Sequence, residues 1–267
     1  MITRSHIAAL FRKEMRDLLR NRAALLPVVL VTLLALALPF GITLVIPLLT
    51  GETLGEDREL LRLSAMQDRD ASLSESGRVQ LFFFQQFLML FLLTPITGAM
   101  SLAAHSVVGE KLARTLEPLL ATPISTLDLL IAKVCGALVP TLAIGIVGVL
   151  LYVIGLAVFA EPGVFMAMMS VRSALLVFLI GPAAALLSLQ AAIVISSRVN
   201  DPRTAQQFGV LIVLPLTALL VAQFTGALWL SASALAAIGA GMLAGWVVFL
   251  LISAALFERE AILTRWR

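Results

Sequence analysis

Residues 81–104 read LFFFQQFLMLFLLTPITGAMSLAA, and no side chain in this stretch is charged. A helix needs about 20 apolar residues to cross the hydrocarbon core of a bilayer. Similar runs recur along the chain and predict six membrane-spanning helices, at approximately 24–49, 81–105, 128–159, 172–196, 207–225 and 230–256. These runs account for well over half of the 267 residues. The sequence therefore predicts an all-α, polytopic membrane protein with one transmembrane domain over residues 1–267.

The composition supports the same class. The chain is 60% hydrophobic and 13% charged, about half the charged fraction of roughly 25% that is usual for soluble domains. The first apolar run continues to Leu49, beyond the ~7–15 residues of a signal-peptide core, so we expect it to be retained as a span. The single cysteine, Cys135, excludes an internal disulfide framework.

The basic residues indicate how the chain is oriented. Most of them precede the first span or follow the second, fourth and sixth: Arg4, Arg12, Lys13, Arg16, Arg20, Arg22, Lys111, Arg114, Lys133, Arg198, Arg203, Arg259, Arg265 and Arg267. The loop after the first span carries Arg58, Arg62, Arg69 and Arg78, but its acidic residues outnumber them. Basic residues near span ends accumulate on the cytoplasmic side. We therefore predict a multi-pass protein of the cell (inner) membrane with both termini in the cytoplasm. The positive charge indicates topology and does not indicate nucleic-acid binding.

Residues 1–23 are predicted to form an amphipathic helix at the cytoplasmic interface. Ile7, Leu10, Phe11, Met15 and Leu18 recur at helical spacing, and the basic residues lie largely elsewhere around the helix. An apolar stripe with basic flanks suits a helix that lies in the membrane interface. The alternative is a basic flank that only orients the first span.

Residues 50–79 are the only sizeable segment expected outside the cell. They are charged and rich in serine, and LGEDRELLRLSAM predicts one short amphipathic helix at about 56–66. The segment is too short for a domain, so a lid or a docking surface is expected. Residues 160–163 predict a tight external turn. The uncharged connection at 224–233 either stays at the interface or re-enters the membrane.

Prolines recur inside five of the predicted spans, at Pro39, Pro95, Pro140, Pro182 and Pro215. A proline removes a backbone hydrogen bond and bends a helix, and neighbouring helices can compensate for the loss. The repetition predicts bent or broken helices around a path. Simple tolerance of proline in lipid is the alternative.

The polar residues inside the spans are neutral. A proton- or sodium-coupled carrier usually needs an ionisable or cation-binding group at membrane depth, and no charged residue is expected near the middle of any span. The candidates for a substrate path are Gln85, Gln86, Gln190 and Tyr152. Such side chains also hydrogen-bond across helices, which is the favoured role for most of them.

The sequence contains no catalytic or nucleotide-binding motif. It has no G-x-x-x-x-G-K-[ST] loop, no Ser/His/Asp set and no cluster with metal-ligand spacing. We therefore expect a non-catalytic chain that binds no cofactor or metal. Active transport would require an energy source on another chain.

The stretch GEKLARTLEPLLATPIS, Gly109–Ser125, separates the second and third predicted spans. Residues 115–120 can form a short helix with an apolar side and a polar side, which ends near Pro123. A rigid helix between two spans would pass a push from a partner to both. The alternative is a solvated connector whose prolines only set a turn.

The longer stretch GEKLARTLEPLLATPISTLDLLIAKV, residues 109–134, resembles the loop of ABC-2 type transporter permeases. The residues that fit the family pattern are Gly109, Glu110, Lys111, Thr115, Leu116, Glu117, Leu119, Leu120, Thr122, Pro123, Ser125 and Lys133. Leu112, Arg114 and Asp128 depart from it. The segments SSRVNDPRTAQQFGVLIVLP at 196–215, FERE at 257–260 and FRKEMRDLLRNR at 11–22 are also similar to the family, so the resemblance extends over essentially the whole chain.

The resemblance implies a permease subunit with six spans, an interfacial N-terminal helix and a cytoplasmic coupling helix within residues 107–127. Two permease chains, identical or different, would pair, and each would dock on an ABC ATPase that binds ATP and Mg. Such complexes export amphipathic or lipid-like substrates. The residues implied in ATPase coupling are Glu110, Lys111, Arg114, Thr115, Glu117, Pro118, Leu119, Leu120, Thr122, Pro123, Asp201 and Arg203.

A second function stays open at this stage. The charged segment 50–79 is also compatible with a membrane scaffold that transmits ATPase motion to a periplasmic partner, in assembly or maturation rather than bulk export.

Overall fold

The computed structural model describes residues 11–13, 15–16, 21–51, 53–67, 73–112, 126–198, 204, 207, 214–215, 218–219, 221–223, 225, 228 and 230–256. Within these ranges it describes only the backbone of 23–24, 66–67, 104–112, 126–130, 197–198 and 254–256. The described part contains helices and no strand. This confirms the all-helical class.

The described elements follow one another in a simple order. They are α2 (Arg22–Phe40), η1 (Gly41–Val45), α3 (Ile46–Thr50), η2 (Leu54–Glu56), α4 (Arg58–Gln67), α5 (Glu75–Leu90), α6 (Leu93–Leu112), α8 (Thr126–Phe159), α9 (Val164–Met168), α10 (Val171–Leu175), η3 (Leu176–Ile180), α11 (Gly181–Arg198) and α13 (Ala232–Leu256). η1 and η3 are π-helical, and η2 is a 3₁₀ turn.

Five helical stretches within the described residues are long and apolar enough to cross a membrane. They are Leu25–Thr50, Glu75–Ala103, Ile131–Phe159, Val171–Ser196 and Ala232–Ser253. They confirm five of the six predicted spans. The other predicted span, 207–225, lies largely outside the described residues; 207, 214–215, 218–219 and 221–223 are helical.

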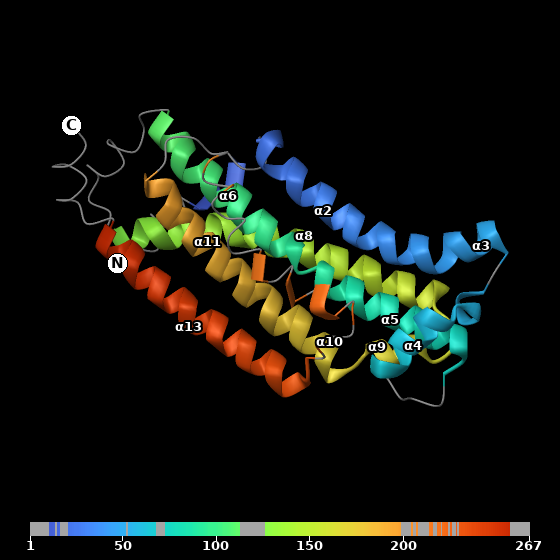
Figure 1. The fold of residues 1–267 in the computed structure, drawn as a ribbon. Helices are drawn as coiled ribbons and strands as arrows, with labels where there is room; N and C mark the ends of the chain where they lie inside the picture. Colours follow the sequence, from blue (N-terminus) through green and yellow to red (C-terminus); the bar gives the residue numbers. More distant parts are fainter. Residues whose placement is uncertain are drawn as a thin grey trace.

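The long helices lie side by side along the molecule (Figure 1). The span formed by α5 and α6 is central, because 83% of its most apolar stretch of 18 residues is buried inside the protein. The same share is 61% in the span formed by α10, η3 and α11. The corresponding values for α2, α8 and α13 are 22%, 17% and 11%. These three helices expose many large apolar side chains, as expected for helices that face lipid.

The bundle has two ends, each with its own buried cluster. We call the end where α2 and α8 begin and α6 and α11 finish the α6 end, and the opposite end, which carries α4 and α9, the α4 end (Figure 1). Ile96, Leu102 and Ile193 belong to the cluster nearer the α6 end. Tyr152, Met168 and Leu235 belong to the cluster nearer the α4 end.

Three of the prolines coincide with irregular backbone. The helix breaks at Phe91 and Leu92, just before Pro95, and Thr94 N there donates to Phe91 O at 3.1 Å. The π segment η1 follows Pro39, and the π segment η3 precedes Pro182. Proline and π bulges are recognised causes of helix kinks. Pro140, in contrast, lies inside the continuous helix α8.

The segment 50–79 contains the expected short helix, α4, over Arg58–Gln67. The second span, however, begins at Glu75 rather than near residue 81. Ser74 caps α5 by accepting a hydrogen bond from Gly77 N at 2.8 Å, and Glu75 lies in the first turn. A serine cap and an acidic first turn stabilise a helix start, so residues 75–79, with the charged Glu75 and Arg78, belong to the helix and not to the loop.

Two expectations for helices outside the membrane concern residues that are mostly not described. In the predicted interfacial helix, residues 11–13 and 15–16 are helical, and the rest of 1–20 lies outside the described residues. Residues 113–125 of the predicted coupling loop lie outside them as well.

Candidate functional site

The predicted ATPase-coupling residues are not among the described side chains. Glu110 and Lys111 belong to the last turns of α6, where only the backbone is described. The residues from Arg114 to Pro123, together with Asp201 and Arg203, lie outside the described residues. The structure does describe the helices on either side of residues 113–125. Helix α6 ends and helix α8 begins at the α6 end, and the two helices pack against each other.

The predicted path residues are all described, and all four are buried. Gln85 and Gln86 lie on α5, Tyr152 lies on α8, and Gln190 lies on α11. Their exposed fractions are 8%, 0%, 2% and 0%, respectively. The structure therefore places each of them inside the bundle rather than on its lipid face.

Tyr152 joins α8 to α5. Its hydroxyl donates a hydrogen bond of 2.7 Å to the carbonyl oxygen of Phe84, and its ring meets Phe84 edge-on with the centroids 6.0 Å apart. Phe40 of α2 completes the group, with centroid distances of 5.2 Å to Phe84 and 5.7 Å to Tyr152. Gly155 makes room for Phe40, because a Cβ there would lie 2.5 Å from Phe40 Cζ.

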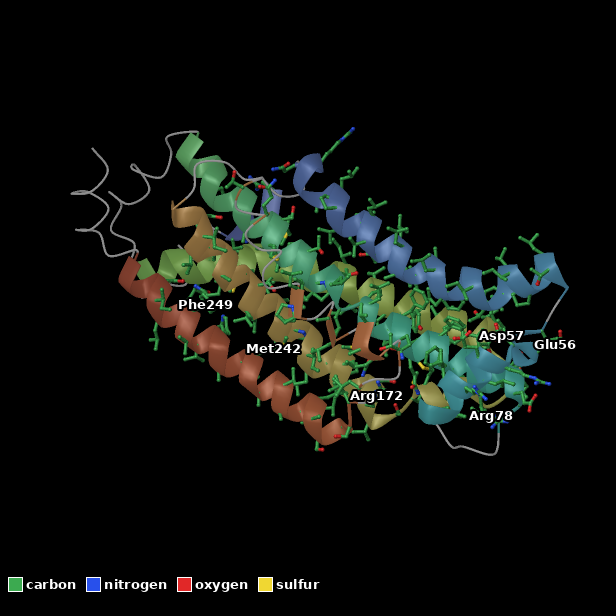
Figure 2. The ribbon with its side chains drawn as sticks, in the orientation of Figure 1. Glu56, Asp57, Arg78, Arg172, Met242 and Phe249 are labelled. Atoms are coloured by element: carbon green, nitrogen blue, oxygen red, sulfur yellow. The ribbon has the colours of Figure 1, made fainter. Side chains whose placement is uncertain are left out.

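Gln85 joins α5 to α10. Arg172 Nη1 donates to Gln85 Oε1 at 3.1 Å, a bond strengthened by the charge on the guanidinium. Arg172 is half-buried. It lies in the α4 half of the molecule (Figure 2), so its charge is close to the end of the span, where a long side chain can reach water.

Gln86 makes the third contact near the α4 end. Its Nε2 donates to the backbone oxygen of Gln223 at 3.3 Å. Gln223 is 2% exposed. The Nε2 and Oε1 atoms of its side chain have no hydrogen-bond partner within the described part of the chain. Three of the four predicted path residues therefore lie along α5 or against it.

Gln190 lies apart from the other three. Its Nε2 donates to Ser253 Oγ of α13, and Ser253 Oγ in turn donates to Phe249 O at 2.8 Å. The neighbouring residues Leu189 and Ile193 belong to the cluster nearer the α6 end, where Phe249 also lies (Figure 2). The structure does not bring the four predicted path residues into one site.

Sequence reasoning missed a polar group at the α4 end. Ser74 Oγ donates to Glu161 Oε2 at 2.5 Å, and Glu161 N donates to Gln80 Oε1 at 2.7 Å. These bonds fix the turn after α8 against the start of α5. The sequence Ser74-Glu75 could have indicated the helix start, because serine followed by an acidic residue is typical of a helix N-terminus. Nothing in the sequence indicates that Glu161, 87 positions away, is the partner of Ser74.

The arrangement of these residues is suited to holding helices together. Every predicted path residue forms a hydrogen bond to another helix or segment. Within the described residues, no group of three His, Cys, Asp or Glu side chains could hold a metal ion. In the described part of the chain, these hydrogen bonds link the helices of the bundle, and we identify no reaction centre among them.

Comparison with known proteins identifies a family. A model of the family described as "ABC-2 family transporter protein" matches residues 8–258. No curated protein and no solved structure gives a match.

Proposed function

The chain belongs to the ABC-2 family of transporter proteins, and from this membership we propose how its transport activity works. It is a multi-pass membrane permease of an ABC transporter. We infer that it pairs with a second permease chain to form a path for ATP-driven export of an amphipathic or lipid-like substrate. The observation that carries the proposal is the family match over 8–258, together with five apolar helices of spanning length.

The energy for transport comes, in this proposal, from a separate ABC ATPase that binds ATP and Mg. Residues 107–127 dock on it as the coupling segment, with Leu119 and Leu120 as apolar anchors. The packing of α6 against α8 supports this role, because the segment connects these two helices directly. A movement of the segment, caused by the ATPase, would therefore be transmitted to both helices.

The proposed orientation places the α6 end in the cytoplasm and the α4 end outside the cell (inner) membrane. The basic residues near the ends of the second, fourth and sixth predicted spans support it. The α4 end carries acidic residues as well as basic ones, among them Glu56, Asp57 and Glu161. The exposed side chains between α3 and α5, among them those of Glu56 and Asp57, would then face the external medium.

A pull-down of the ATPase tests the coupling segment. We expect the double variant Leu119→Asp, Leu120→Asp to lose docking, because burying two leucines contributes roughly 3 kcal/mol or more, about a hundredfold or more in affinity. The matched control is Met166→Asp, Met169→Asp: these two apolar residues are 75% and 50% exposed, in and just after α9, between two of the spans. The control should recover the ATPase as the wild type does. Undiminished recovery with the Leu119, Leu120 variant would show that the segment is only a connector.

A further inference from the structure

An apolar pocket of about 250 Å³ lies between three of the spans. It is lined by residues 88–95 at the break between α5 and α6, by residues 142–150 of α8, and by residues 177–182 of η3 and α11. These ranges lie near the middle of the spans Glu75–Ala103, Ile131–Phe159 and Val171–Ser196. The pocket is therefore at the depth of the hydrocarbon core.

The pocket results from the irregular backbone around it. Pro95 and Pro182 both line it, next to the helix break and the π segment described above. On the facing helix α8, Gly145 contributes no side chain, and a Cβ added there would meet no atom within 4 Å. A helix break on one span, a π-helical segment on another and a missing side chain on the third surround space that the protein itself does not fill.

The pocket opens toward the lipid face of the bundle. Its rim includes Ile146 at 60%, Leu150 at 56% and Phe178 at 78% exposure. Its inner wall includes Leu88 and Leu92, which are 5% and 4% exposed. The opening is thus rimmed by side chains that face the bilayer, and the wall belongs to the buried centre of the molecule.

The chemistry of the lining selects the occupant. Every lining side chain is apolar, glycine or proline. A bound water needs about 2–4 polar partners, which this lining does not offer. An empty apolar space loses dispersion contacts on every side. The volume is a little below the ~300–1,000 Å³ of pockets that enclose drug-sized molecules, so a segment of a flexible chain suits it.

We propose that this pocket binds one acyl chain of a bilayer phospholipid. At this depth the surrounding medium consists of acyl chains, and the opening faces them. The proposal requires only that the chain spans a membrane, and it is independent of which substrate is exported. A side chain from a second copy of the protein is the competing occupant.

Photo-labelling in vesicles tests the proposal. The full-length chain is reconstituted in phosphatidylcholine vesicles that contain a small fraction of phosphatidylcholine with a diazirine in the middle of one acyl chain. After irradiation, we expect labelling of Ile146, Val149 and Phe178 several times that of Val247 and Val248, which are exposed on α13 outside the pocket and lie away from the ends of its span. Equal labelling of the two sets would overturn the proposal.

Filling the pocket gives the decisive comparison. Gly145→Phe should reduce pocket labelling severalfold, and the smaller Gly145→Leu should reduce it partly. Gly241→Phe is the matched control, because a Cβ at Gly241 on α13 also meets no atom within 4 Å and that residue does not line the pocket. It should label as the wild type does. If the Gly145→Phe variant does not insert normally into the membrane, the labelling of the Gly145→Leu variant tests the proposal.

The competing occupant has its own readout. Ile146→Cys, in a background with Cys135→Ala, places a thiol at the rim of the pocket. Oxidative cross-linking of two chains through this position, together with weak lipid labelling, would assign the pocket to a second copy and overturn the proposal. Unlinked chains with strong labelling support the acyl chain.

Discussion

At the scale of single residues, Tyr152 shows how a polar group in a span serves the fold. Its hydroxyl reaches the Phe84 carbonyl oxygen on another helix. We expect Tyr152→Phe to lower the free energy of unfolding by about 1 kcal/mol, the net value of one hydrogen bond. For a chain of this size the melting temperature in detergent should fall by about 2–4 °C, as a thermal unfolding measurement would show.

A larger truncation provides the comparison. Tyr152→Ala also removes the ring that packs against Phe40 and Phe84, and buried aromatic residues replaced by alanine cost about 3–5 kcal/mol. The two variants should therefore rank clearly in stability. If Tyr152→Phe leaves stability unchanged and abolishes transport, the hydroxyl contacts the substrate, and the structural role is wrong.

The residue scale is also where sequence reasoning reached its limit. The sequence identifies Gln85, Gln86, Gln190 and Tyr152 because few polar side chains occur in the apolar runs. It does not identify their partners, because Tyr152 and Phe84 are 68 positions apart and Gln86 and Gln223 are 137 apart. Such pairs depend on which spans pack together, and the apolar pattern of a lipid-facing helix does not encode its neighbour.

At the scale of elements, the proline breaks set the shape of the central span. Pro95 has no N–H for the carbonyl oxygen of Phe91, which accepts from Thr94 N instead. Pro95→Ala restores the missing donor, so we expect a more regular helix from α5 into α6. Amide hydrogen exchange over residues 91–99 should slow about fivefold, the effect of roughly 1 kcal/mol.

A proline outside the long helices controls for this effect. Pro162 lies in the turn at 160–163, where Val164 N donates to Glu161 O. Pro162→Ala should leave exchange over residues 91–99 unchanged, because no helical hydrogen bond is restored there. Unchanged exchange in Pro95→Ala would mean that packing around the break, and not the proline, determines it.

Whole elements were predicted more reliably than their ends. The first span was expected at 24–49 and is found at Leu25–Thr50, and the short helix expected at about 56–66 is found at Arg58–Gln67. The start of α5 was missed because Glu75 and Arg78 appeared as loop residues. A capped helix can carry charges in its first turns when they lie beyond the hydrocarbon core, so hydropathy alone places the start too late.

At the scale of the whole molecule, the described helices determine how often the chain must cross the bundle. Helix α11 runs toward the α6 end, where Ile193 joins the cluster nearer that end. The next long helix, α13, begins near the α4 end, where Leu235 joins the other cluster. Gln223 is already beside α5 in that half, through its contact with Gln86. We therefore predict that the chain returns from one end to the other between residues 198 and 223, because the described residues before and after this stretch lie at opposite ends.

This return makes the number of crossings even, and we predict that both termini lie on the same side of the membrane. Single cysteines are introduced at Ser5, Ala65 or Thr264 after Cys135→Ala. Because α4 is expected outside and Ala65 is exposed, Ala65→Cys should react in intact cells with a thiol reagent that does not cross membranes. Ser5→Cys and Thr264→Cys should react only after permeabilisation. Labelling of Thr264→Cys but not Ser5→Cys in intact cells would mean an odd number of crossings and would contradict a six-span permease, whereas labelling of both would reverse the proposed orientation and preserve the even count.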